Sequence, residues 1–239
     1  MSRDLLPLIA GAEPVQRLAS LRAAVPGRIV FTTSFGLEDQ AITHLIAGAG
    51  LDIALATLDT GRLFPETYDL WKQTEARYGI KIQAFSPDPE AVKAYVATSG
   101  LNGFYESKDA RLACCEIRKV EPLRRALAGA AAWITGLRAD QSAARESVPL
   151  AGWDEAHALV KVAPLFDWSR ARVAAFTEAE GVPVNALHAR GYVSIGCEPC
   201  TRAIQPGEPE RAGRWWWEND AQRECGLHVD SSGRLVRAA

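Results

Sequence analysis

The five cysteines of this 239-residue chain divide into two close pairs and one separate residue. Cys114 and Cys115 are adjacent, and Cys197 and Cys200 form a C-x-x-C in the stretch GCEPCTR. Cys225 stands in the polar stretch ECGLH, whereas a buried structural cysteine would sit in an apolar run. Because a disulfide framework is not expected in a reducing compartment, this pattern favours metal binding or thiol chemistry.

The two cysteine pairs have residue types that suit a metal centre. Four thiolates can bind a tetrahedral zinc ion or a 4Fe–4S cluster. Adjacent side chains diverge, so Cys114 and Cys115 make a poor zinc knuckle, whereas the separate irons of a cluster can each take one sulfur. The pattern therefore favours one 4Fe–4S cluster per chain, with Cys114, Cys115, Cys197 and Cys200 as ligands. Zinc, or a redox dithiol at Cys197 and Cys200, remains an alternative.

Strands that alternate with helices are expected to position these residues. β-Branched and aromatic runs predict strands over 28–35, 51–60, 80–86, 131–137 and 158–166. Helical spacing predicts helices over 36–50, 64–79, 89–100, 114–129 and 167–181, the last with Asp167 as N-cap. This alternation predicts an α/β fold with a mostly parallel sheet and helices on both faces. From about residue 186 the pattern changes to loops and polar helix.

Three loops follow predicted strands and are expected to line one crevice, because ligands of such sheets bind at the carboxyl ends of the strands. They are TSFGLEDQ (33–40), LDTGRLFPE (58–66) and GLRADQSAAR (136–145). Small residues and Gly36 let N–H groups at a helix start face an anion. Asp59 is a candidate acceptor for a nucleotide, and Gly61 would allow close approach. Neither a Walker loop nor a dinucleotide fingerprint is present.

Cations near these loops could hold a small anion. Lys119 follows the adjacent cysteines by four residues, so on a helix it would share a face with Cys115. Arg138 ends a predicted strand at the crevice, and Arg145 in the same loop is a weaker candidate. Arg211 and Arg214, spaced i and i+3 in ERAGRWWWE, are expected to project from one face of a helix. Arginine can bind an anion through two hydrogen bonds.

Charge and hydropathy exclude several classes of protein. Net charge is −2, from 27 basic and 29 acidic residues, so no general attraction to nucleic acid or to an anionic membrane is expected. No apolar stretch reaches the roughly 20 residues that span a bilayer, and the first residues do not resemble a secretory signal. The sequence predicts a cytoplasmic protein with a nucleotide-binding domain over 1–200 and a C-terminal segment over 201–239.

The loop motifs resemble a known family. SFGLEDQ with LDTGRLFPET is similar to the modified phosphate loop of the sulfonucleotide reductases, relatives of the PP-loop ATP pyrophosphatases, whose usual loop reads S-G-G-x-D-S. CCEIRKVEPL, GCEPCTRAIQPGEPERAGRWWWE and ECGLH resemble the iron–sulfur branch of this family, the assimilatory adenylylsulfate reductases. The resemblance spans about residues 28–228. It implies an adenine nucleotide alpha hydrolase-like (PP-loop) fold with a mobile catalytic tail.

The resemblance also implies an activity, the thiol-dependent reduction of adenylylsulfate to sulfite and AMP in sulfate assimilation. Cys225 would attack the substrate sulfur, and thioredoxin or glutaredoxin would release sulfite from the resulting S-sulfocysteine. Because thiols supply both electrons, the cluster would position Lys119 and tune the electrostatics of the site. The implied substrate-binding positions are Ser34, Phe35, Gly36, Leu37, Glu38, Asp39, Leu58, Asp59, Thr60, Gly61, Lys119, Arg138, Arg211, Arg214 and His228.

Other functions remain open from the sequence. The same chemistry on the 3′-phosphorylated substrate would need an extra cation near the ribose. An ATP-consuming PP-loop ligase or tRNA-thiolating enzyme with a cluster is disfavoured by the bulky Phe35 and by ECGLH. In an iron–sulfur electron-transfer or sensor module, Cys225 would be dispensable. The three tryptophans at 215–217 could serve as a core anchor or as a docking surface, and packing is favoured. The oligomeric state stays open, a homo-oligomer included.

Overall fold

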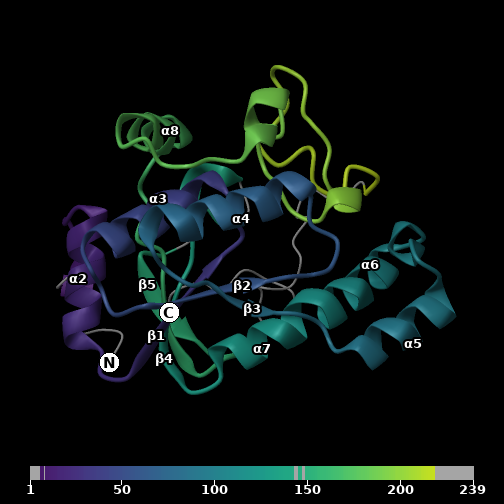
Figure 1. Cartoon of the computed structure of the whole chain (residues 1–239), viewed down its shortest axis with the longest axis horizontal. Coiled ribbons are helices and arrows are strands. Elements are labelled where there is room, and N and C mark those ends of the chain that lie inside the picture. Colours follow the sequence, from purple (N-terminus) through teal and green to yellow (C-terminus); the bar gives the residue numbers. More distant parts are fainter. Residues whose placement is uncertain (1–5, 8, 143–144, 147–148, 219–239) are drawn as a thin grey trace.

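The computed structural model describes residues 6–7, 9–142, 145–146 and 149–218 (Figure 1). Its described residues form a six-stranded sheet in the order β3-β2-β1-β4-β6-β5. The strands are β1 Arg28–Thr33, β2 Ala54–Leu58, β3 Gln83–Phe85, β4 Ala130–Ile134, β5 Ala151–Asp154 and β6 Leu159–Val162. All neighbouring strands pair in parallel except β5, which pairs antiparallel with β6. The predicted mostly parallel α/β sheet is therefore confirmed.

Helices cover both faces of this sheet, as alternating strands and helices require. They are α2 Pro14–Ala24, α3 Leu37–Gly48, α4 Pro65–Tyr78, α5 Pro89–Ser99, α6 Lys108–Cys115, α7 Glu121–Leu127 and α8 Arg170–Ala179. Short 3₁₀ turns span Gly103–Tyr105, Ala139–Gln141, Ala186–Arg190 and Glu198–Cys200, and a π turn spans Glu116–Val120. Figure 1 shows α3 and α4 on one side of the strands and α5, α6 and α7 on the other.

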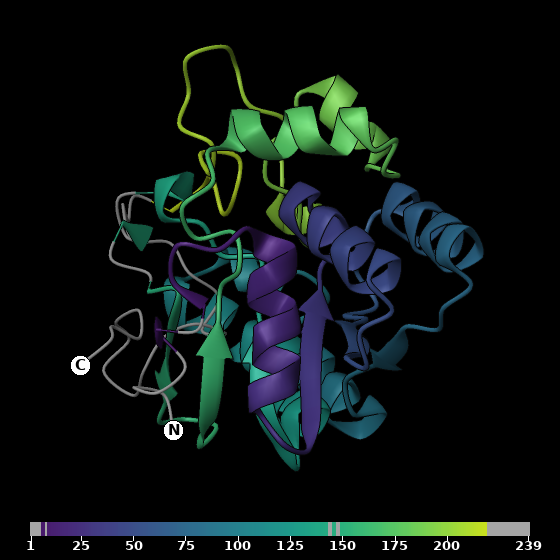
Figure 2. The ribbon, with the colours of Figure 1, turned by 90° about the vertical axis from the view of Figure 1, so that its left-hand side faces the viewer.

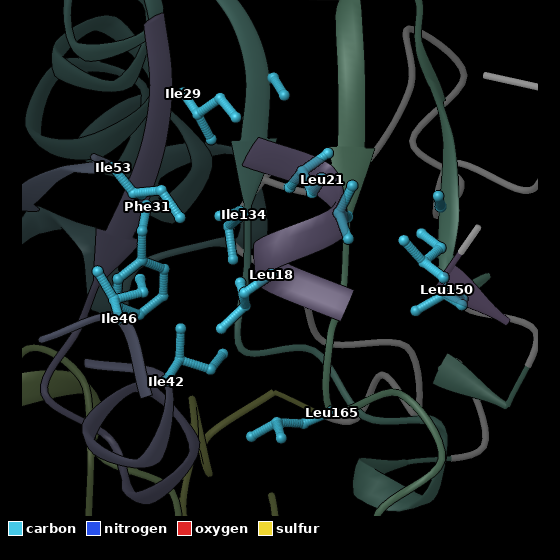
Figure 3. Close-up of a cluster of buried hydrophobic side chains, with 14 of the residues drawn as sticks. Leu18, Leu21, Ile29, Phe31, Ile42, Ile46, Ile53, Ile134, Leu150 and Leu165 are labelled. Carbon is cyan, nitrogen blue, oxygen red and sulfur yellow. The ribbon is translucent and has the colours of Figure 1, made fainter. Parts of the chain in front are cut away.

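Alternate strand residues supply the cores on the two faces, because successive side chains point to opposite sides of a strand. Phe31 of β1 and Ile134 of β4 pack with residues of α2, α3 and α8 in the larger cluster (Figure 3). Val30 and Trp133, their neighbours along the chain, pack on the other face against residues of α7. Central strands buried on both faces read as continuous apolar runs, which is why they were visible in the sequence.

The strand boundaries differ from those expected. Each predicted strand is present but shorter. Its last residues turn out of the sheet into the loops at the carboxyl end, and β2 and β3 also begin three residues later than expected. A further strand, β5 Ala151–Asp154, was not expected from the sequence. It has only four residues at the edge of the sheet, too few for an alternating pattern to stand out.

Two local helix expectations were wrong. Asp167 does not cap α8; its carboxylate pairs with Arg17, and the Ser169 side chain accepts the hydrogen bond from Arg172 N instead. Arg211 and Arg214 do not lie on a helix; Arg211 lies in a turn, and Arg214 forms a β-bridge with Thr201.

The helix expected over 114–129 is divided. It consists of the end of α6, the π turn and α7. Pro122 lies at the start of α7 directly after the π turn, and the backbone stays helical on both sides of the junction.

The carboxyl ends of the parallel strands point toward the end of the molecule where α8 and residues 201–218 lie (Figure 2). Within the described part of the chain, no helix combines the length and apolar character needed to cross a bilayer.

One buried cation ties α2 to the loop before α8, and its removal gives a first prediction. The Arg17 side chain is 4% exposed; Nη1 donates to Pro164 O at 2.8 Å, and the guanidinium donates to both Asp167 oxygens at 2.7 Å. We expect Arg17→Ala to lower the free energy of unfolding by about 2 kcal/mol, because a buried carbonyl and a half-buried carboxylate lose their donor.

The measurement is the denaturation midpoint of the anaerobic protein, followed by circular dichroism. Lys93→Ala is the control, since its pair with Glu90 is exposed on both sides and should contribute about 1 kcal/mol or less. Equal effects of the two substitutions would contradict the role given to Arg17.

Candidate functional site

A cavity of about 180 Å³ opens at the carboxyl ends of β1, β2 and β4. Its walls come from 32–39, from Thr57, Leu58, Thr60, Leu63 and Thr67, from Lys119, Leu123 and Trp133, from 135–137 with Gln141 and Arg145, and from 193–196 with 210–211 and 214–215. All three loops expected to line one crevice contribute to it, so that prediction is confirmed. The predicted positions Ser34, Phe35, Gly36, Leu37, Glu38 and Asp39 all lie on its wall, as do Leu58 and Thr60.

The loop between β1 and α3 has an unusual backbone at its centre. Phe35 has φ of 59°, a left-handed conformation that disfavours large side chains, and its ring is 1% exposed and stacked on Trp71 at 5.6 Å between centroids. Packing of the ring therefore holds the strained turn. Phe35 N donates to Thr33 Oγ1 at 3.0 Å, so the anion donors must come from the first turn of α3, after Gly36.

Asp39 braces this loop from inside the molecule. Its Oδ2 accepts from Ser34 N at 2.6 Å and from Ser34 Oγ at 2.7 Å. Burial raises the pKa of Asp39 from 3.8 to about 6, although the bonds from Ser34 and the charge of Arg145 act in the opposite direction. The other carboxylate oxygen rests against Gly136, where a Cβ atom would overlap it. Gly136 is thus required by the close approach of this carboxylate.

Four cationic side chains line the cavity: Lys119, Arg145, Arg211 and Arg214. Arg214 is 7% exposed and lies over the Trp215 ring, with its Cζ 4.6 Å from the centroid. Its guanidinium packs against Gly196, where a Cβ atom would overlap Nη2. Although Arg211 and Arg214 are not helical, tight turns bring both to the same wall, where anion binding is favoured.

Arg138 differs from the expectation, because its side chain is not on the cavity wall. It is fully buried and ion-paired with Glu38, Asp140 and Glu210. Arg145, seven residues later, lines the cavity instead and is 6% exposed, with Nη1 donating to Gln141 Oε1 at 2.6 Å. The sequence offered both arginines in one loop, and nothing in it said which of them faces inward.

Asp59 and Gly61 likewise lie outside the cavity wall. Asp59 Oδ1 accepts from Tyr68 Oη at 2.7 Å and from Gly61 N at 3.0 Å, so it shapes the turn after β2. Gly61 has φ of 68°, the left-handed region that glycine tolerates. The acidic residue missed at this site is Glu210, which lines the cavity and precedes Arg211 directly in the sequence.

The four clustered cysteines line a second, smaller cavity of about 20 Å³. Cys115 and Cys197 are buried, Cys114 and Cys200 are half-buried, and none of the four is in a disulfide. Lys119 and Trp215 line both cavities, so the two share a wall. The expected common face of Lys119 and Cys115 is therefore present, although a π turn rather than an α-helix carries the lysine.

The pKa shifts of Cys114, Cys197 and Cys200 differ in direction. Burial raises the pKa of Cys200 to about 12, and burial also raises the pKa of Cys114. For Cys197 burial acts in the same direction, but the charge of Lys119 and a 3.3 Å contact with Thr60 Oγ1 outweigh it and lower the pKa. Among the described residues, no three His, Cys, Asp or Glu side chains converge on a point that could hold a single metal ion. Cys225 and His228 lie outside the described residues.

Fold and site together define an α/β protein with a cation-lined cavity at the carboxyl ends of its strands and four cysteines in an adjoining cavity. The family model described as "Phosphoadenosine phosphosulfate reductase domain" matches residues 28–203, and the chain belongs to this family.

Curated relatives place the chain more narrowly. It is 60% identical over 220 residues to the adenosine 5′-phosphosulfate reductase of Rhizobium meliloti, covering 92% of this chain and 83% of the relative. Identity to the adenosine 5′-phosphosulfate reductase of Agrobacterium fabrum is 57%, covering 92% and 85%. Identity to the adenosine 5′-phosphosulfate reductase of Allochromatium vinosum is 54%, covering 84% of this chain and 78% of the relative.

Solved structures agree with this fold. A phosphoadenylyl-sulfate reductase of Candida auris, in a phosphate complex, superimposes with a TM-score of 0.72 at 27% identity, covering 84% of this chain and 95% of that one. An FMN adenylyltransferase of Candida glabrata has a TM-score of 0.51 at 14% identity, covering 98% and 85%. The second likeness concerns the fold alone, and it confirms the predicted adenine nucleotide alpha hydrolase-like architecture.

The raised pKa of Asp39 predicts a pH-dependent stability. A carboxyl that titrates near 6 in the folded chain and near 3.8 when unfolded binds its proton more tightly in the fold, so stability falls as pH rises through this window. Asp39→Asn keeps an acceptor for Ser34 and removes the titration. We expect wild type to lose about 1.4 kcal/mol relative to Asp39→Asn between about pH 5 and about pH 7.5.

Thermal unfolding of both proteins at the two pH values measures this difference. Other titrating groups are common to both proteins and cancel. Parallel pH profiles would contradict burial of a titrating carboxyl at this position.

Proposed function

We propose that this protein reduces adenosine 5′-phosphosulfate to sulfite and AMP with electrons from a thiol. The observation that carries the proposal is the wall shared by the two cavities. Lys119 and Trp215 separate a cation-lined cavity at the carboxyl ends of the strands from a cavity lined by four cysteines. The names of the curated relatives, at 54–60% identity, support the same substrate.

The residues of the large cavity suit both anionic groups of such a substrate. The first-turn N–H groups of α3, beginning at Gly36 and Leu37, would bind the phosphate, where the helix dipole favours negative charge. Lys119, Arg211 and Arg214 would bind the sulfate, and we add Arg145 to this set. Burying these anions without cations would be costly, so four cations on one small cavity wall are a specific feature.

The chemistry would be a transfer of the sulfonyl group to Cys225, followed by an exchange at sulfur that releases sulfite. The Cys225 thiolate attacks the substrate sulfur, the bond between that sulfur and the phosphate oxygen breaks, and AMP leaves with the electron pair. A thiolate of thioredoxin or glutaredoxin then attacks Cys225 Sγ, and sulfite leaves with the electrons of the S–S bond. The second thiol of the reductant resolves the mixed disulfide and restores Cys225. Cations around the sulfate stabilise the charge that develops in the first transfer.

The four cysteines fit a 4Fe–4S cluster by their donor set. They line one cavity, and the adjacent Cys114 and Cys115 suit the separate irons of a cluster better than a single tetrahedral ion. Partial burial raises the pKa values of Cys114 and Cys200, so their thiolates would need the compensating charge of iron. The cluster would supply electrostatic stabilisation beside the sulfate, since the thiols already account for both electrons. Cys115 and Cys197 complete the ligand set.

Preference for the substrate without a 3′-phosphate also has a basis in charge. Three acidic side chains, Glu38, Asp39 and Glu210, lie on the wall of the large cavity. A third anionic group on the nucleotide would need a further cation. Phosphoadenylyl-sulfate is therefore the second candidate substrate, and comparison of the two nucleotides belongs in the decisive experiment.

Metal content tests the cysteine centre. We expect anaerobically purified protein to hold about four iron and four sulfide per chain, with a visible absorption band, and Cys197→Ser to lose both. Cys225→Ser is the matched control, because this cysteine is not a proposed ligand and its variant should retain the full iron content. One zinc per chain, or iron retained in Cys197→Ser, would contradict the proposed centre.

The sulfur transfer to Cys225 can be isolated by omitting the reductant. We expect a sulfonate adduct on Cys225 by intact mass after incubation with adenosine 5′-phosphosulfate, with release of sulfite on addition of thioredoxin. Cys225→Ser should show no adduct, and phosphoadenylyl-sulfate run in parallel should react more slowly. No adduct from either nucleotide, with the iron content intact, would refute the reductase proposal and return attention to an ATP-dependent PP-loop enzyme.

A further inference from the structure

Arg138 holds two carboxylates that both line the large cavity. Its Nε donates to Glu38 Oε1 at 2.8 Å, and its Nη2 lies 3.0 Å from both carboxylate oxygens of Glu210. Arg138 is 0% exposed, and the side chains of Glu38 and Glu210 are 11% and 17% exposed. Buried arginine–carboxylate bonds of this kind fix orientation, because the planar guanidinium accepts only a few arrangements.

The two carboxylates come from segments far apart in the sequence. Glu38 lies in the first turn of α3, beside the proposed phosphate donors. Glu210 directly precedes Arg211 in the C-terminal segment, and Arg170 at the start of α8 approaches it at 3.6 Å. Asp140 adds a third carboxylate to Arg138. One buried cation therefore joins the phosphate-binding turn to the segment that carries the cavity arginines.

The two arginines of that segment are held in different ways. Arg214 is placed by its own contacts, because Thr201 and Arg214 form a β-bridge and the guanidinium packs between Gly196 and the Trp215 ring. The Cζ atom of Arg211 lies 6.0 Å from the Trp215 ring centroid. Arg211 directly follows Glu210 in the same turn, and Glu210 is the residue that the buried cation holds. Fixing the Glu210 carboxylate therefore restricts the backbone from which the Arg211 side chain extends.

We propose that Arg138 is a positioning residue that sets Arg211 toward the sulfate through Glu210. This inference rests on the proposed function, and it replaces direct substrate binding by Arg138. Glu210 presents a negative charge to a cavity that binds anions, so as an isolated charge it would weaken substrate binding. Because Arg138 holds Glu210 beside Arg211, Glu210 instead favours substrate binding by keeping Arg211 in place. Removing Glu210 should therefore weaken binding of the anionic substrate.

The test measures binding to the iron-loaded full chain with Cys225→Ser, in which no sulfur transfer occurs. We expect Glu210→Ala to weaken binding of adenosine 5′-phosphosulfate by about tenfold, the scale of one charge-assisted hydrogen bond, and to leave binding of adenosine within about twofold. Glu208→Ala is the matched control. Glu208 lies two residues earlier and pairs with Arg202 at 2.8 Å, a more exposed pair off the cavity wall. It should leave both affinities unchanged.

A double-mutant cycle with Arg211→Ala identifies the path of the effect. If Glu210 acts through Arg211, Glu210→Ala has no further effect once Arg211 is removed. Arg138→Gln should lose affinity for the phosphosulfate to the same extent as Glu210→Ala, and the two losses should not add. Glu210→Ala alone keeps the proposal testable if the Arg138 variant does not fold.

Several results would overturn the inference. Unchanged or tighter binding of the phosphosulfate by Glu210→Ala would show that Glu210 acts only as a charge. An equal loss for adenosine would show a merely structural role, and additive losses with Arg211→Ala would exclude the path through Arg211. Failure of the parent chain to prefer adenosine 5′-phosphosulfate over adenosine would instead refute the proposed function, so the two failures are distinguishable.

Discussion

The carboxyl end of the sheet buries charged groups close together, and the site depends on how each of them is paired. Burial of an unpaired ion costs far more than any single packing contact contributes. Arg138 shares Glu38 and Glu210, Asp39 takes two hydrogen bonds from Ser34, and neither arrangement is available to a chain lacking the fold around it. The same pairings that make these charges tolerable also hold the loops at fixed distances from one another. Stability and geometry of the cavity are therefore set by the same contacts.

Two chemically different cavities lie side by side, and a second set of contacts holds the wall between them. Arg111 is buried, lies over the Trp215 ring at 4.6 Å and pairs with Glu218, so the C-terminal segment is fastened to the helix that ends at Cys115. Trp215 N also donates to Cys200 O at 3.1 Å. These contacts make Trp215 part of both walls. A cysteine centre at this place would be separated from the anion cavity by one lysine and one indole ring, so its electrostatic effect would act over a short, partly buried path that salt screens little.

The likeness to an FMN adenylyltransferase at 14% identity shows how far the sheet and its helices are separable from their chemistry. That likeness concerns the fold alone, whereas the cysteines and the arginines of this chain line cavities at the carboxyl end of its sheet. Phe35 illustrates the difference. Its left-handed backbone and its stacking on Trp71 fill the centre of the turn with an apolar ring instead of leaving glycines there. Adenosine 5′-phosphosulfate reductases are 54–60% identical to this chain over most of its length, which is why motif and fold lead to one family.

Much of this protein was predictable from its sequence, because buried parallel strands leave apolar runs and phosphate loops and paired cysteines leave short local motifs. The α/β class, the three loops at one edge and the placement of Lys119 and Cys115 on one cavity wall all follow from such local patterns. The fold decided what depends on contacts between distant segments. These are that Arg145 rather than Arg138 faces the cavity, that Glu210 lies on its wall, and that Arg211 and Arg214 reach it from a turn and a β-bridge rather than from a helix. Two arginines seven residues apart look alike in sequence. Only the carboxylates brought beside one of them, from residues 38 and 210, determine which is buried as a structural cation and which remains at the cavity.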